Sequence, residues 1–240
     1  MNQMFRLSMR QLAGQRRIAI IALLAALPIL IAVLVSIFAN DDDSFNENFI
    51  NSLLAGMLIS GILPIVTMAL ATTAFANELD DKTLSYLVLK PIRRSFIVLP
   101  KLLATIAIAG PLLVISGVVA TILGLETARA TLAVGIALAV GVITYASIFT
   151  WAGLISTRAL GFALVYVFVW EGLITSFFQN IQYLSVRGYT MSIMYGLDKT
   201  GFESISSQVI NLYAGIVGAA AVTVVFFLLT VRRLSRMDIP

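Results

Sequence analysis

Between Lys101 and Glu126 the chain reads LLATIAIAGPLLVISGVVATILGL (102–125), a run without a charged side chain. Such a run is longer than the roughly 20 residues that a helix needs to cross the hydrocarbon core of a bilayer. A helix is the expected form, because the backbone polar groups of a lipid-exposed segment must be paired within that segment. This stretch therefore predicts a transmembrane helix.

Other stretches share this character: 18–40, 48–77, 130–157 and 204–231 carry no charge, and 159–186 carries only Glu171. We therefore predict an all-α, polytopic membrane protein that forms a single transmembrane domain over 1–240. Its six spans are expected at about 18–39, 53–75, 102–124, 131–152, 159–178 and 209–231. A cytoplasmic segment is expected at 76–101 and an outer segment at 179–208.

The composition supports a membrane protein and excludes several kinds of chemistry. Of the 240 residues, 60% are apolar and only 12% are charged, whereas globular proteins carry about 25% charged residues. The chain has no cysteine and no histidine, which excludes disulfides, thiolate chemistry and a Ser-His-Asp relay. Gly-Lys does not occur, so the chain lacks the phosphate-binding loop. We expect no enzymatic activity, no bound cofactor and no metal, with cation binding at Asp41-Asp42-Asp43 as the alternative to a solvated turn.

The basic residues indicate the orientation. With the N-terminus in the cytoplasm, thirteen Lys and Arg residues lie on the cytoplasmic side, and three, Arg129, Arg187 and Lys199, lie outside. The positive-inside rule then predicts that both termini are cytoplasmic. Because the basic residues flank apolar runs, the net charge of +4 points to membrane lipid and not to nucleic acid as the partner.

The first seventeen residues combine one apolar side with several arginines, which is typical of a helix lying at the membrane interface. A disordered basic tail is the alternative. The apolar run that follows, 18–39, is longer than the roughly 7–15 residues of a signal-peptide core. We therefore expect it to be a retained first span and not a cleaved signal peptide.

Glu171 is a carboxylate inside a predicted span. A charge near the bilayer centre costs about 2.5–3.5 kcal/mol or more, so it is expected to face protein or water. One interpretation is a carboxylate on a transport pathway or gate. The other is a buried hydrogen bond to a neighbouring helix, with Gly172 allowing a close approach.

The cytoplasmic segment carries a helix pattern with a distinct charge order. Asn77 is a plausible N-cap, and Glu78, Asp80 and Asp81 follow it where the helix dipole favours negative charge. Glu78 and Lys82 are spaced for an i,i+4 pair, and Pro91 ends the pattern. The segment is expected to offer an acidic start and a basic end to a cytoplasmic partner, or else to lie passively on lipid.

This segment resembles a known family. The residues that carry the resemblance fit the pattern E-x4-T-L-x2-L-x3-P-I-x-R-x6-K and are Glu78, Thr83, Leu84, Leu87, Pro91, Ile92, Arg94 and Lys101. The pattern is similar to the link between the second and third spans of type-2 ATP-binding-cassette (ABC) exporter permeases. The six-span layout and the aromatic-rich 166–172 are similar as well. Lys82 and Pro100 stand where the family usually has glycine.

The resemblance implies a function. Such bacterial inner-membrane permeases pair as dimers, here a homodimer, and each subunit docks a separate ATPase, which holds ATP and Mg, through the helix between spans two and three. The pattern residues and their neighbour Asp81 would then form the ATPase-coupling region, and Glu171 and Trp170 would lie on the pathway or at its gate. The alternatives are a proton- or ion-driven carrier that uses Glu171, and a membrane scaffold that docks a partner without moving cargo.

Overall fold

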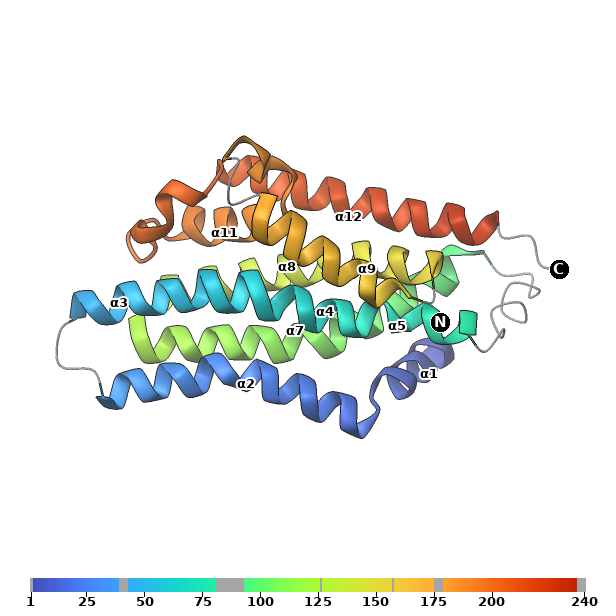
Figure 1. The fold of residues 1–240 in the computed structure, drawn as a ribbon, viewed down its shortest axis with the longest axis horizontal. Coiled ribbons are helices and arrows are strands. Elements are labelled where there is room, and N and C mark those ends of the chain that lie inside the picture. The colour runs from blue at the N-terminus through green and yellow to red at the C-terminus, as the bar shows by residue number, and fades with distance from the viewer. Residues whose placement is uncertain are drawn as a thin grey trace.

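The computed structural model describes residues 2–38, 43–80, 93–125, 127–156, 158–174 and 179–236. Within these ranges the regular structure is entirely helical. The long helices run side by side along the longest axis of the molecule (Figure 1). This arrangement confirms the prediction of an all-α protein.

Four long helices match predicted spans: α2 (Gln15–Phe38), α7 (Ser95–Leu125), α8 (Ala128–Ile155) and α12 (Leu212–Ser235). A further span is composite and consists of α3 (Asp43–Ser52), the π-helix η1 (Leu53–Ile62), α4 (Leu63–Ala71) and α5 (Thr73–Asp80). These five segments are long and apolar enough to cross a membrane.

The remaining predicted span, 159–178, is helical over α9 (Ala159–Val165) and the π-helix η2 (Tyr166–Ile174). Its apolar helical part is shorter than the other five, and 175–178 lie outside the described residues. The count of six spans therefore stays a prediction.

Shorter helices complete the chain. α1 (Asn2–Leu12) precedes the first span, where an interfacial helix was expected. The predicted outer segment contains the 3-10 helix η3 (Gln179–Leu184), α11 (Val186–Leu197) and the 3-10 helix η4 (Glu203–Gln208).

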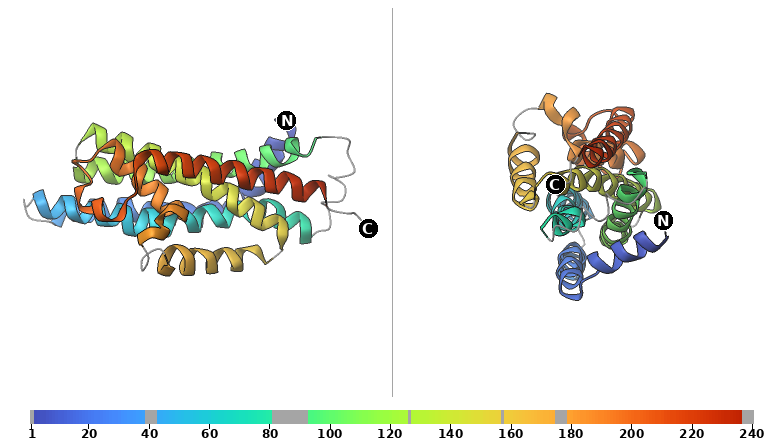
Figure 2. Two further views of the ribbon diagram at one scale, coloured as in Figure 1. Left: turned by 90° about the horizontal axis from the view of Figure 1, so that it is seen from above. Right: turned by 90° about the vertical axis from the view of Figure 1, so that its right-hand side faces the viewer.

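α8 is the central helix of the bundle, with α4, α5, α7, α9, α11 and α12 packed around it. Figure 2 shows this arrangement along the bundle axis. Small side chains on α8 explain its central position, because they let neighbouring helices approach closely in membrane bundles. A Cβ added at Gly141 would lie 2.8 Å from Thr190 Oγ1, and one added at Gly153 would lie 2.3 Å from the carbonyl oxygen of Thr72.

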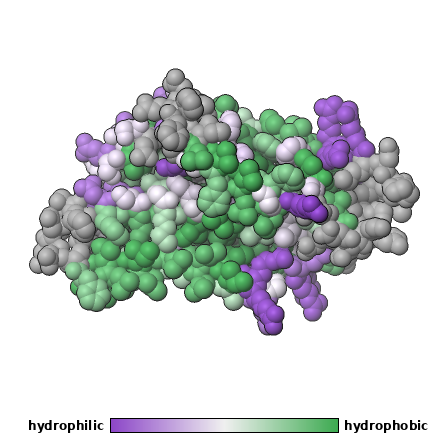
Figure 3. Space-filling view, viewed as in Figure 1, coloured by the Kyte–Doolittle hydropathy of each residue, from purple (hydrophilic) through white to green (hydrophobic). Residues whose placement is uncertain are grey.

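The surface agrees with a membrane location. Apolar side chains cover the middle of the face in Figure 3, and hydrophilic ones gather towards the two ends. Exposed large apolar residues include Leu23 and Ile37 on α2, and Val217 and Leu228 on α12. We name the end that carries α1 and the last turn of α12 the basic end, because Arg232 and Arg233 lie there, and the opposite end the distal end.

Candidate functional site

The junction at the basic end

The predicted cytoplasmic segment begins and ends in helix. Asn77 lies inside α5 and not before a new helix, so the expected N-cap is wrong. Ser95 begins α7, which is therefore already helical before the predicted third span. Residues 81–92, which hold most of the predicted coupling helix, lie outside the described residues.

Glu78 and Lys101 form a buried ion pair. The ammonium Nζ of Lys101 donates to Oε1 of Glu78 at 2.6 Å, and both side chains are more than nine-tenths buried. The pair joins α5 to α7. Lys82, the partner that the i,i+4 spacing suggested for Glu78, lies outside the described residues. Breaking such a pair from one side leaves an uncompensated buried charge.

Further contacts hold α5 in place around this pair. Lys101 Nζ also donates to the carbonyl oxygen of Ala74 and lies 4.6 Å from the ring centroid of Phe75. Phe75 belongs to a buried apolar cluster with Ile97, Val98, Leu154 and Leu234. We name this group, together with Glu78 and Lys101, the basic-end junction. It connects α5 with α7, α8 and α12.

Three of the predicted coupling residues are described: Glu78 and Lys101 are buried, and Arg94 is half-buried. The other six, Asp81, Thr83, Leu84, Leu87, Pro91 and Ile92, lie outside the described residues. Because their side chains are buried, Glu78 and Lys101 expose little surface to another protein. The family pattern pointed to both residues, but no local spacing rule would have paired them across the segment.

The carboxylate of Glu171

Glu171 lies in η2 and is 2% exposed. Its Oε1 accepts hydrogen bonds from the backbone N–H of Val186 at 3.0 Å and from the Tyr166 hydroxyl at 3.3 Å. Its Oε2 accepts from the Ser185 hydroxyl, and the backbone of Arg187 also donates to the carboxylate. The carboxylate is therefore hydrogen-bonded through both of its oxygens.

Apart from Tyr166, which belongs to η2, these donors lie at the N-terminus of α11. Ser185 is its N-cap and accepts from the backbone N–H of Gly188 at 3.1 Å. The first N–H groups of a helix have no partner within the helix, and its dipole favours negative charge there. The N-terminus of α11 thus supplies what a carboxylate inside a membrane protein requires.

Of the two interpretations of Glu171, the hydrogen bond to a neighbouring helix is what the structure contains. Among the described atoms Gly172 shows no close approach to another helix: the nearest to an added Cβ is the carbonyl oxygen of Val167, at 3.7 Å. Trp170 is partly buried, and its Nε1 donates to the carbonyl oxygen of Leu184 at 3.2 Å. A pathway or gating role for Glu171 and Trp170 stays a prediction.

Other features and the family

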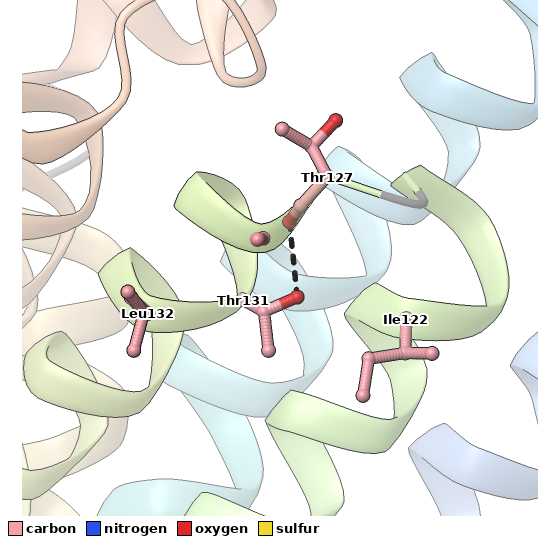
Figure 4. A pocket seen from close by; sticks show the side chains of 5 residues that line it. Ile122, Thr127, Thr131 and Leu132 are labelled. Carbon is pink, nitrogen blue, oxygen red and sulfur yellow. Dashed lines mark hydrogen bonds between the residues drawn. The ribbon is translucent and has the colours of Figure 1, made fainter.

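Outside these two sites the described residues offer little that suits chemistry. A shallow hollow lies where α7 ends and α8 begins (Figure 4), lined by Ile122, Thr127, Ala128, Thr131 and Leu132. Its polar groups are threonines, and Thr131 Oγ1 already donates to the Thr127 carbonyl. Among the described residues no group of three or more Asp or Glu side chains could hold a metal ion.

Comparison with known proteins identifies the family. The family model for ABC-2 family transporter proteins matches residues 15–187, which is well over half of the chain. No curated protein matches the sequence significantly. The matched region includes Glu78, Lys101 and Glu171. The chain therefore belongs to the ABC-2 family of transporter proteins, the membrane permease subunits of ABC transporters.

Proposed function

We propose that this chain is the permease subunit of an ATP-driven exporter, which works as a homodimer with two separate ATPase subunits in the inner membrane. The ATPase docks on the cytoplasmic segment 81–92, between Glu78 and Lys101. Each ATPase subunit binds ATP and Mg, and this chain binds neither. The family supports the permease role; direction, dimer and docking are the proposal.

The observation that carries this proposal is the buried pair of Glu78 and Lys101. The two residues precede and follow the proposed docking segment, so a buried ion pair joins the helices on either side of it. In the same junction Phe75 of α5 belongs to one buried cluster with Leu154 of α8 and Leu234 of α12. A displacement of the docked ATPase would thus reach several spans together. Coupling then requires that the ATP-bound ATPase favours one arrangement of these spans over the other.

A proton-driven carrier is less well supported. In such a carrier an intramembrane carboxylate would have to exchange protons with water, but Glu171 is buried and held by donors from α11. Proton dependence of transport remains the measurement that would favour this alternative.

Co-purification tests the proposal. The tagged protein is isolated from its native membrane, and bound proteins are identified by mass spectrometry while ATPase activity is assayed with and without vanadate. A stoichiometric partner with a phosphate-binding loop and vanadate-sensitive activity is expected. The variant Asp81→Lys should reduce that partner, whereas Glu203→Lys, at an exposed acidic residue, should not. A clean preparation without an ATPase would overturn the proposed function.

A further inference from the structure

We infer that Glu171 is a latch that holds the distal half of the α9–η2 helix against the N-terminus of α11. When the carboxylate leaves these donors, η2 separates from α11. The inference concerns a movement within this chain; only its consequence for transport rests on the proposed function.

One side of the latch, α11, is fixed to the bundle. At Gly141 of α8 and at Gly196, Gly215 and Gly218, an added Cβ would lie within 3.2 Å of a neighbouring side chain. The contacts at Gly196, Gly215 and Gly218 join α11 to α12. Such close packing on glycine leaves little room for sliding. α11 is therefore a firm support.

The other side, α9–η2, is attached along one buried stripe, which is flanked by the half-buried Tyr166 and Trp170. Over 159–173 its buried side chains are Ala159, Ala163, Val167 and Glu171, spaced at intervals of four residues. Many of its remaining side chains face outwards, among them Phe162, Phe168 and Leu173. Figure 2 shows this helix at the side of the bundle. Glu171 is the charged member of the stripe and, among the described residues, the member nearest the distal end.

The energetics make the charged contact decisive. Lipid tails are as apolar as leucine, so small apolar residues such as Ala163 and Val167 lose little free energy when they leave the bundle and contact lipid. By contrast, the Glu171 carboxylate and the N–H groups of α11 that donate to it would lose much free energy on separation, because polar groups in hydrocarbon without a partner are costly. The latch can therefore open only where water or a polar group of a cargo molecule replaces these hydrogen bonds. η2 therefore separates from α11 only when polar groups gain access to this region.

The absence of cysteine from the sequence allows a direct distance measurement. Spin labels at Leu173→Cys on η2 and Leu197→Cys on α11, both exposed positions, report the latch. A second pair, Leu197→Cys with Val217→Cys on α12, reports the support. Pulsed EPR on the purified protein in lipid nanodiscs compares the wild type with Glu171→Leu, the isosteric Glu171→Gln, and Glu203→Gln as a matched control.

We expect one narrow distance between η2 and α11 in the wild type and in Glu203→Gln. In Glu171→Leu the distribution should broaden and gain a longer component, with a smaller change in Glu171→Gln, while the α11–α12 distance stays the same. An unchanged η2–α11 distance in both Glu171 variants would overturn the inference. So would broadening of both pairs, because the carboxylate would then be a cap that keeps α11 folded.

Ser185→Ala provides a second route if Glu171→Leu does not fold. It retains the carboxylate but removes the hydroxyl donor to Oε2, and it should broaden the η2–α11 distance. The EPR experiment uses this chain alone. Absence of an ATPase partner from the co-purification would thus overturn the proposed function but not the latch. Unchanged EPR distances would overturn the latch but not the proposed function.

Discussion

The ammonium of Lys101 lies 2.6 Å from the carboxylate of Glu78, although 22 residues separate the two along the chain. The pair closes the cytoplasmic segment into a loop whose two ends meet at the basic-end junction. A protein that pulls on such a loop acts on both adjoining spans at once, because neither end can move without the other.

Removal of the cation should be strongly destabilising. In Lys101→Met the Glu78 carboxylate stays buried without a counter-charge, and we expect a loss of about 3–5 kcal/mol of unfolding free energy. Thermal unfolding in detergent measures it, with Lys199→Met, at an exposed lysine, as the control. The double variant Glu78→Gln, Lys101→Met should recover most of the loss. A double variant as unstable as Lys101→Met would show that the lysine acts by packing alone.

Replacement of Gly153 by a larger residue should cause a local steric clash. A Cβ added there would lie 2.3 Å from the carbonyl oxygen of Thr72, which is backbone and cannot swing aside. We expect Gly153→Ala to cost about 1–3 kcal/mol, as other overpacking substitutions do. Gly161→Ala is the matched control, because no described atom lies within 4 Å of its added Cβ. Equal melting temperatures for the two variants would contradict the close contact of α8 with Thr72.

Asn51 ties the outer segment to α3. Its Nδ2 donates to the carbonyl oxygen of Gly201 at 2.9 Å, and it is 3% exposed. Asn51→Ala should cost about 1–3 kcal/mol, because a buried acceptor loses its partner. We also expect faster trypsin cleavage at the neighbouring Lys199 in spheroplasts. Ser52→Ala, whose hydroxyl bonds within its own helix, should leave the cleavage rate unchanged.

Removal of the Tyr166 hydroxyl distinguishes the effect of its hydrogen bond from that of its ring packing. It donates to Glu171 at 3.3 Å, while its ring packs edge-on against Phe149 with centroids 6.2 Å apart. Tyr166→Phe keeps the ring contact and should cost only about 0.5–1.5 kcal/mol, the net value of one ordinary hydrogen bond. Glu171→Gln should lower transport more than expression. Transport in Tyr166→Phe as low as in Glu171→Gln would mean that the hydroxyl has a role of its own.

Much of the fold could be predicted from the spacing of charges. Hydrocarbon excludes charged side chains, so the uncharged run 102–125 had to be a helix, and α7 covers it completely. The ends of the helices could not be predicted in this way. α7 begins at Ser95 and so contains Lys101, whose charge is paired with Glu78 inside the protein. A count of charges does not recognise such a pair.

The candidate site was predictable only in part. Glu171 was conspicuous as a carboxylate in an apolar run, and the energetic rule that it must face protein was correct. Its partner could not be found, because the N–H groups of Val186 and Arg187 are backbone atoms and the sequence does not show where a backbone helix end will lie. Ser185 carried no signal beyond the common preference for serine at helix starts.

The π-helix η1 divides the second span into two parts with separate anchors. On the distal side Asn51 is bound to Gly201, and on the basic side the Thr72 carbonyl lies against Gly153. A π turn holds about one more residue than an α turn, so conversion of one such turn would rotate everything beyond it by about 100°. With both ends clamped, that rotation would be stored as twist between them. A change of turn type in the second span would therefore have to be absorbed between these two contacts, where η1 lies.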